Sequence, residues 1–435
     1  MNYFKYQNGR LFCEEVDLER MSTIETPFYL YSWNTFKEHF LRFQESFKEL
    51  DPLICFAVKT CNNPVILRGL AQLGAGMDIV SGGELYLCSR AGVPANKIVY
   101  AGVGKTVKEI EYAIDQGIGF FNIESEPEFI RIEEIATRKN KVMNALLRVN
   151  PDEYDAKTNV KTITGKKGGK FGVDLEHVPD FFDTHGKSNY LKLAGLHIHI
   201  GSPIYSAEPY TKAISKLTDL IGKLKSKGFQ IHYMDIGGGY AADYEDGASP
   251  SWDEYSKEIV SPLKRLIDSG IKIIMEPGRT IAANAGILVS EVQYVKKTDQ
   301  NRAIIIVDTG MHHLIRPALY GASHFIWPVN PGESFTVTER KFDLDFDGLA
   351  ECDIAGPICE SSDFLAKERK LPPVVSSDRL AIFTAGAYGM VMSSQYNSHP
   401  RPAEYLIDKD KIIMIRERET YEDLTSHLAL ISSKV

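Results

Sequence analysis

The sequence predicts an α/β protein, a TIM (β/α)8 barrel with a C-terminal antiparallel β-domain that also takes in the N-terminal segment. Between about residues 50 and 285, short apolar runs rich in β-branched residues alternate with stretches of helical period. Runs that are apolar throughout are typical of a parallel sheet buried on both faces. Eight such units in roughly 235 residues match the size of a TIM barrel, and an open doubly wound sheet is the alternative.

Eight strand candidates make up the predicted barrel. In chain order they are LICFAVK (53–59), MDIVS (77–81), IVYAG (98–102), FFNIE (120–124), ALLRVN (145–150), LAGLHIHIG (193–201), IHYMDIG (231–237) and IKIIMEPG (271–278). Helical patterns lie between them, such as PVILRGLAQLG, GELYLCSRAG and VKEIEYAIDQG. The last two patterns end at a glycine, as helices prefer to.

The hydrophobic period changes after residue 286. Short strand patterns replace the helical ones, namely GILVSEVQYVKK, RAIIIVDTG, SFTVTER, ECDIAG, LAIFTAGAYG and IIMIRE. They indicate an antiparallel sheet domain. Because the early segment TPFYLYS is also strand-like, we expect residues 34–285 to form the barrel and residues 1–33 plus 286–435 to form the second domain.

Composition and charge exclude several functions. The 435 residues include 50 basic and 58 acidic side chains, which give a net charge of −8. This sign is wrong for a surface that holds nucleic-acid or membrane phosphates. The first residues lack a signal-peptide pattern, and no apolar run approaches the roughly 20 residues that span a bilayer. We therefore expect a cytoplasmic protein that binds neither nucleic acid nor membrane. Since the six cysteines are sparse and show no CxxC spacing, we expect them to be free thiols.

A lysine ends the first predicted barrel strand, at the rim where TIM-barrel active sites lie. Alternation places Cys55, Ala57 and Lys59 on one strand face. Partial desolvation there favours the neutral amine, a nucleophile suited to Schiff-base chemistry. A surface lysine that merely reaches solvent is the alternative.

Two further segments end strands at the same rim. Gly237-Gly238-Gly239 follow the seventh strand, and Glu276-Pro277-Gly278-Arg279 close the eighth. Bare glycine amides and an arginine fork suit a phosphate, although a plain tight turn would also explain the glycines. A buried carboxylate at Glu276 needs a cation or a proton, which a protonated pyridine nitrogen or a neighbouring Arg or Lys would provide.

Two histidines, His197 and His199, share one face of the sixth predicted strand. Their spacing could indicate a metal pair and therefore a metal-dependent barrel hydrolase. Such a site needs more ligands, yet no further histidine ends a predicted barrel strand. We therefore predict no metal site. An imidazole stacked on a planar ligand needs one of the pair, and the other is then a core histidine.

A dozen ordered motifs carry a family resemblance. They are FAVK, LGAGMDIVSGGELY, GVGKT, FNIESE, LRVNP, KFGVD, GLHIHIGS, DIGGG, EPGR, MHHLIRPALYG, GPICESSD and GAYG. The series, from about residue 25 to 405, resembles the diaminopimelate decarboxylase family, pyridoxal-phosphate enzymes of the alanine-racemase-like barrel group. The resemblance implies a pyridoxal 5'-phosphate cofactor and decarboxylation of meso-2,6-diaminopimelate to L-lysine and carbon dioxide, the last step of lysine biosynthesis. The alternative is a decarboxylase of another basic amino acid, such as ornithine or arginine, on the same fold.

The resemblance also implies roles for individual residues. Lys59 would form the internal aldimine, His199 would stack on the cofactor ring and Glu276 would meet the pyridine nitrogen. The other positions that match cofactor-binding residues are Asp78, Ser202, Gly238, Gly239, Gly278, Arg279 and Tyr388. The positions that match substrate-binding residues are Arg279, Arg316, Tyr320, Glu360 and Tyr388.

The resemblance also implies a homodimer with shared active sites. Cys359 matches the cysteine that returns a proton to the α-carbon, and the Cys359-Glu360 segment would reach the partner subunit's site. Some positions depart from the family pattern, among them Thr60-Cys61, His312-His313, Ser362 and the segment GASHF. They leave every chemical role filled and concern the fine substrate preference.

Overall fold

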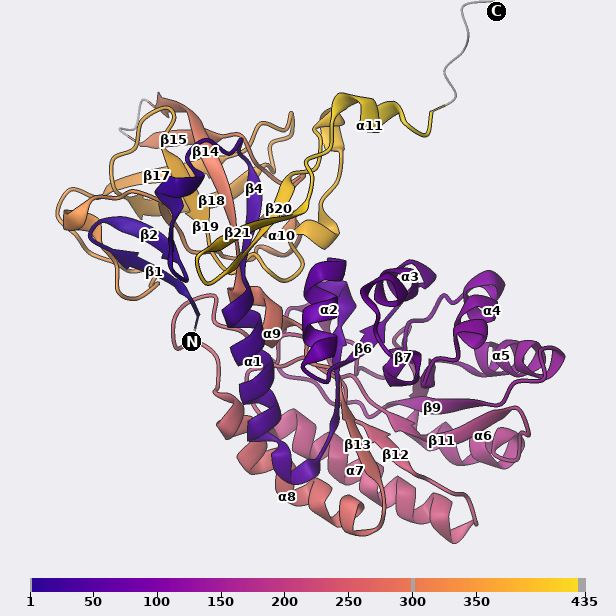
Figure 1. Cartoon of the computed structure of the whole chain (residues 1–435). Helices are drawn as coiled ribbons and strands as arrows, with labels where there is room; N and C mark the ends of the chain where they lie inside the picture. Colours follow the sequence, from indigo (N-terminus) through magenta and orange to yellow (C-terminus); the bar gives the residue numbers. More distant parts are fainter. Residues whose placement is uncertain (1, 299–301, 429–435) are drawn as a thin grey trace, which may run out of the picture. The chain divides into compact units, whose positions relative to one another are not determined.

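The computed structural model describes residues 2–298 and 302–428, and the chain divides into two compact units (Figure 1). The barrel unit comprises residues 37–242 and 247–281. The β-unit comprises the chain up to Phe36, the short segment Asp243–Asp246, and the chain from Ala282 onward. Residues 243–246, which the sequence pattern leaves inside the barrel, thus cluster with the β-unit.

Eight parallel strands close the barrel unit. They are β5 (Leu53–Ala57), β6 (Gly76–Ile79), β7 (Ile98–Tyr100), β8 (Phe120–Ile123), β9 (Met143–Asn150), β11 (Leu191–His197), β12 (Tyr233–Asp235) and β13 (Lys272–Met275). The pairing of β13 with β5 and of β8 with β9 completes the ring, and a short β10 (Val173–Asp174) adds to β9. The predicted TIM barrel is therefore confirmed over an open doubly wound sheet.

Helices follow the barrel strands and lie outside the ring in Figure 1. They are α2 (Pro64–Gln72), α3 (Gly82–Ala91), α4 (Val107–Gln116), α5 (Glu126–Arg138), α6 (Val178–His185), α7 (Glu208–Ser226) and α8 (Trp252–Asp268), with α1 (Trp33–Ser46) before β5 and α9 (Arg279–Ala282) after β13. Helix α4 ends at Gly117, whose φ of 69° is left-handed backbone that glycine adopts without steric cost. This end is the one that the glycine in the sequence predicts.

The interior of the barrel is a packed core. Its centre is a cluster of side chains from five strands, Cys55, Val99, Phe120, Leu146 and Ile274. Since these side chains fill the ring, the chemistry is confined to the rim where the strands end. In the described part of the chain, no helix combines the length and apolar character that crossing a membrane requires.

The β-unit holds two sheets. The first is the antiparallel sheet of β1 (Phe4–Gln7), β2 (Arg10–Cys13) and β3 (Val16–Asp17). The second has the order β18-β17-β15-β14-β4-β20-β21, with β19 paired to β14 and β16. Its strands are β4 (Phe28–Ser32), β14 (Gly286–Lys297), β15 (Ala303–Val307), β16 (Ile326–Pro328), β17 (Ala350–Ala355), β18 (Phe364–Leu371), β19 (Arg379–Ile382), β20 (Ala403–Asp408) and β21 (Lys411–Arg416).

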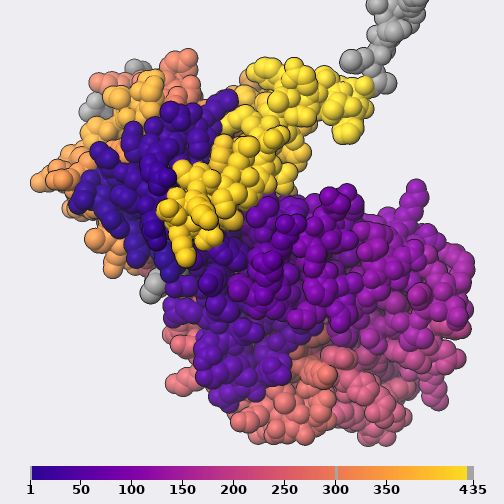
Figure 2. Space-filling view, viewed as in Figure 1, coloured from indigo at the N-terminus to yellow at the C-terminus, as the bar shows by residue number. Residues whose placement is uncertain are grey.

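The N-terminal segment is part of the β-unit, as the sequence predicts. Strand β4, from the segment TPFYLYS, pairs antiparallel with β14 and parallel with β20. Figure 2 shows the same neighbourhood at the surface, where N-terminal residues in indigo lie beside C-terminal residues in yellow. A strand from the N-terminal part of the chain and one from the C-terminal part are thus neighbours in one sheet. The short helix α10 (Arg316–Tyr320) lies between β15 and β16, and α11 (Tyr421–Thr425) follows β21.

One predicted strand, SFTVTER, is wrong. A turn at Gly332, with φ of 81°, leads into a single 3-10 turn over Glu333–Phe335. The hydroxyl of Thr336 accepts a hydrogen bond from the Gly9 backbone 3.1 Å away, and the Phe335 carbonyl accepts one from the Trp327 side chain at 3.0 Å. The segment is therefore held by side-chain hydrogen bonds, and it is not among the paired strands of the described residues. The apolar pattern reflects burial of Val337 in an irregular segment.

Candidate active site

Lys59 lies at the end of the first barrel strand. Strand β5 stops at Ala57, and one 3-10 turn over Val58–Thr60 holds the lysine at the rim. Its Nζ forms an ion pair with Asp78 of β6, whose side chain is fully buried, while the lysine side chain remains 30% exposed. Burial, followed by repulsion from Glu276, raises the pKa of Asp78, and Lys59 opposes this shift. Asp78 therefore anchors an amine that solvent and ligands can reach.

His199 is a neutral ring held by the glycine segment. The backbone N–H of Gly238 donates to His199 Nδ1 at 3.2 Å. Because an amide N–H can only donate, Nδ1 carries no proton and the ring proton is on Nε2. Burial, followed by the charges of Arg148 and Lys59, lowers the pKa of His199 well below its usual range. The ring can thus stack on a planar ligand without adding a charge.

The three glycines after β12 are required by close packing. Gly237 and Gly239 have left-handed φ values of 69° and 105°. A Cβ on Gly238 would overlap the carbonyl oxygen of Glu276, and one on Gly239 would overlap that of Gly201. Bare backbone lets the loops after β11, β12 and β13 meet, and it leaves a surface that a ligand can approach closely.

A basic side chain closes this surface. The Nε of Arg279 donates to the hydroxyl of Ser202 at 3.0 Å, and Arg279 is only 7% exposed. The neighbouring Gly278 packs closely on the turn that carries Lys59, since a Cβ there would lie 2.6 Å from Thr60 Cγ2. A guanidinium, a hydroxyl and glycine backbone together are suited to a phosphate group.

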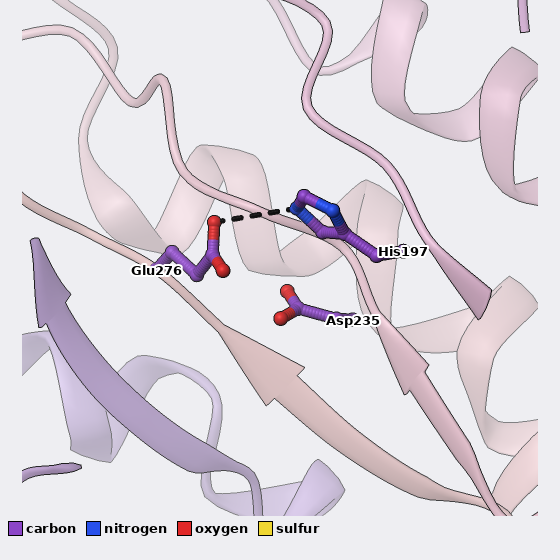
Figure 3. A group of neighbouring side chains, drawn as sticks. All are labelled: His197, Asp235 and Glu276. Atoms are coloured by element: carbon purple, nitrogen blue, oxygen red, sulfur yellow. Dashed lines mark ion pairs between the residues drawn. The ribbon is translucent and has the colours of Figure 1, made fainter. Parts of the chain in front are cut away.

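Glu276 belongs to a buried group of three side chains (Figure 3). A ring nitrogen of His197 and one carboxylate oxygen each of Asp235 and Glu276 all lie within 4.8 Å of one another. Asn122 Nδ2 donates to Glu276 Oε1 at 3.2 Å, and His197 Nε2 lies 3.4 Å from Oε2. Burial alone would raise the pKa of Glu276, but His197, Lys59 and His199 outweigh it and hold the pKa below its usual range. Glu276 is thus an anion suited to a cationic nitrogen.

The remaining predicted site residues belong to the β-unit. Arg316 begins α10 and is buried, Tyr320 ends it, and Cys359 and Glu360 are exposed on the loop between β17 and β18. Hydroxyls of Ser362 and Tyr396 donate to the Glu360 carboxylate.

Tyr388 is held in a strained backbone conformation. Its φ of 58° is left-handed, which is uncommon for a bulky residue. Such strain is frequent at functional sites. The roles of all the β-unit residues remain predictions.

Sequence reasoning missed the supports of these residues. The ring of His324 donates from Nδ1 to the Phe383 carbonyl, so its Nε2 accepts from Arg316 at 2.9 Å. The Arg316 guanidinium also lies 4.6 Å from the centre of the Tyr244 ring. His324 appears in the sequence only as a departure within GASHF. In the barrel, Asp235 ends β12 and Asn122 is the second-last residue of β8, so the rule that found Lys59 could have found them.

The nine predicted site residues of the barrel unit are linked by contacts at one rim. Replacing Gly238 tests this close packing. Gly238→Ala is expected to destabilise the protein by roughly 1–3 kcal/mol, because the added methyl must displace backbone. It should also move the Gly238 N–H away from His199. Thermal unfolding and ligand titration measure both effects.

Gly222→Ala in α7 is the matched control, since Gly222 is exposed and its added Cβ would meet nothing within 4 Å. A Gly238→Ala protein as stable as the wild type would contradict the close approach of these loops.

Comparison with known proteins gives consistent matches. Residues 33–283 match the family described as pyridoxal-dependent decarboxylase, pyridoxal binding domain. The chain is 44% identical to a diaminopimelate decarboxylase of Aquifex aeolicus, over 97% of this chain and 96% of that protein. It resembles the Helicobacter pylori diaminopimelate decarboxylase complexed with L-lysine, with a TM-score of 0.86, 38% identity and coverage of 94% and 98%. The M. jannaschii enzyme with L-lysine gives a TM-score of 0.89 at 34% identity, covering 98% of each chain.

Proposed function

Because the chain belongs to the diaminopimelate decarboxylase family of pyridoxal-dependent decarboxylases, we propose that it converts meso-2,6-diaminopimelate to L-lysine and carbon dioxide. One observation carries the proposal. The rim of one barrel brings together an anchored lysine, a neutral histidine, an ionised glutamate and an arginine with glycine backbone. Each is needed by a different part of the same cofactor.

The residues present fit pyridoxal 5'-phosphate. Lys59 would hold it covalently through its amine, His199 would stack on its ring and Glu276 would meet its pyridine nitrogen. Its phosphate would bind at Ser202, Gly238, Gly239, Gly278, Arg279 and Tyr388. The close packing of this backbone supports the placement, since Cβ atoms at Gly238 and Gly278 would overlap their neighbours. When bound, pyridoxal phosphate supplies an electron sink for the bond that loses carbon dioxide.

Side chains of the protein control the charges and the protons around the bound cofactor. The Glu276 carboxylate holds a proton on the pyridine nitrogen, because an anion with its pKa held low favours the cation beside it. Asp78 keeps the Lys59 amine at the rim. The Sγ of Cys359 delivers a proton to the α-carbon after carbon dioxide leaves.

The distal end of the substrate defines specificity. Diaminopimelate carries an ammonium and a carboxylate at the end that does not react. Arg316 would bind that remote carboxylate through two parallel hydrogen bonds, with Tyr320 beside it, and Glu360 would bind the ammonium. His324 and Tyr244 hold the Arg316 guanidinium in a fixed orientation, which reduces the entropy lost on binding.

The substrate panel tests this function. Carbon dioxide release should be at least about 100-fold more efficient, in kcat/KM, from meso-diaminopimelate than from ornithine or arginine, since these lack the remote carboxylate that Arg316 would bind. Parallel assays on one preparation measure the ratio. Arg316→Met should lower kcat/KM for diaminopimelate and leave that for ornithine nearly unchanged. Comparable efficiency with ornithine in the wild type would refute the assignment.

We also propose a homodimer with shared active sites, a cytoplasmic location and cofactor binding by residues 34–285. Exposure of Cys359 and Glu360 in the described chain supports the first proposal, because both groups are open to a second subunit. Six cysteines without a disulfide suit a reducing compartment. All the cofactor-binding candidates except Tyr388 lie within residues 34–285.

A further inference from the structure

Three side chains from consecutive barrel strands meet inside the ring (Figure 3). His197 ends β11 and Asp235 ends β12, and the two residues are paired in register. Glu276 directly follows β13, the next strand. The three are between 0% and 4% exposed. Glu276 has a place in the proposed function, and His197 and Asp235 have none so far.

His197 is positioned to act on Glu276. Its Nε2 lies 3.4 Å from Glu276 Oε2, within reach of an ion pair and slightly long for a hydrogen bond. Among the described residues, neither ring nitrogen has a hydrogen-bond partner. No hydrogen bond from another described residue therefore draws the His197 ring away from Glu276. Since Asn122 donates to the other Glu276 oxygen, both carboxylate oxygens are restrained.

Asp235 and Glu276 have opposite environments. Asp235 Oδ1 accepts from the Gly237 N–H at 2.8 Å, whereas its buried Oδ2 has no hydrogen-bond partner within the described chain. Burial, followed by the charge of Glu276, raises the pKa of Asp235, while His197 and Lys59 keep that of Glu276 low. Two adjacent buried carboxylates cannot both ionise at low cost, so the proton resides on Asp235.

We propose that His197 is a positioning residue, which keeps Glu276 ionised and directed at the pyridine nitrogen of the cofactor, with Asp235 as its neutral neighbour. The inference rests on the proposed function, since the pyridine nitrogen belongs to that cofactor. Among the described residues, the other charged or titratable groups that act on this trio are Lys59, Asp78 and His199, together with the Cys55 thiol and the Tyr240 hydroxyl. In this proposal His197 acts through Glu276, which its Nε2 approaches to 3.4 Å.

The principal test compares His197→Leu with His197→Gln in the holoenzyme. Leucine removes the nitrogen, so Glu276 should take up its proton at higher pH. The acidic limb of the kcat profile and the pH titration of cofactor absorbance should both move up by about one unit, and the Kd for pyridoxal phosphate should rise about tenfold. Glutamine presents an N–H near the same place and should restore at least half of each shift. The control is His232→Gln. His232 is exposed and directly precedes β12, so its replacement should change neither the pH profiles nor the Kd.

A double variant separates positioning from general damage. If His197 acts through Glu276, then His197→Leu should add less than about twofold to the loss caused by Glu276→Gln. Losses that multiply, or a His197→Leu profile that superimposes on the wild type, would overturn the proposal. Should His197→Leu fail to fold, nitrogen NMR of the cofactor-free wild type provides the test. The His197 ring signals should change in Glu276→Gln, and unchanged signals would refute the contact.

Two further experiments distinguish a metal site, and failure of the proposed function, from the role proposed for His197. The trio also has the donor types of a metal site, so Zn²⁺ is added to the cofactor-free wild type. One tightly bound ion per chain that His197→Leu loses would assign the trio to a metal and overturn the proposal. Absence of carbon dioxide release from diaminopimelate in the wild type would refute the proposed function alone. The absorbance titration and the Kd in the same samples would still decide the role of His197.

Discussion

Lys59→Ala is expected to lose the visible absorbance of the protein loaded with pyridoxal phosphate and to lower kcat for meso-diaminopimelate on the order of 10⁴-fold or more. The reason is covalent: the Lys59 amine stands at the rim, paired with the buried Asp78, and an alanine leaves no nucleophile at that position. Absorbance spectra and steady-state kinetics measure the two effects. The residues proposed to bind the phosphate, among them Ser202, Gly238 and Arg279, are unchanged in this variant. Some non-covalent cofactor binding should therefore remain.

Lys272→Ala is the matched control for this variant. Lys272 is exposed at the start of β13, at the end of the ring opposite the site, and its loss should change neither spectrum nor rate. Borohydride reduction followed by peptide mapping should place the cofactor mass on the peptide that contains Lys59. A normal spectrum in Lys59→Ala, or the mass on another lysine, would assign the covalent link elsewhere and remove the basis of the proposed function.

Cys359→Ala is expected to reduce kcat roughly 10²- to 10⁴-fold, the range for a lost proton donor, while the cofactor spectrum stays normal. Cys359 is the exposed thiol among the six cysteines, and its backbone N–H donates to Asn397 Oδ1 at 3.1 Å, which fixes this part of the loop. Cys352→Ala, a buried thiol in β17, is the control and should retain the wild-type rate. Unaltered turnover in Cys359→Ala would exclude this thiol from the reaction.

Mixing two inactive variants tests whether the sites are shared. If Lys59 and Cys359 in one site come from different subunits, heterodimers of Lys59→Ala and Cys359→Ala each contain one intact site. Random reassociation of equal amounts should then restore about one quarter of wild-type activity, since half of the dimers are mixed and half of their sites are intact. No recovery on mixing, with heterodimers demonstrated, would contradict shared sites.

The barrel was predictable because each strand and helix has a local signature. Strand β13 contains the apolar run Ile273–Met275 and α4 is followed by a glycine, and both features depend on neighbours within a few residues. The segment SFTVTER shows the limit of this reasoning, since its apolar pattern is real while its hydrogen bonds join it to distant residues such as Gly9 and Asp246 and not to a neighbouring strand of its own pattern. Lys59, Glu276 and Arg279 could be singled out because parallel strands end at a common rim.

The sequence alone thus determined the closed barrel, the β-domain with its N-terminal strand, and the residues that stand at the ends of the barrel strands. The tertiary structure alone decided which of these residues touch. It paired His197, not His199, with Glu276, set Asp235 beside them, and placed His324 and Tyr244 against Arg316. Such contacts join residues that lie from 8 to 79 positions apart. They depend on strand register, ring closure and side-chain direction, which no local pattern in the chain encodes.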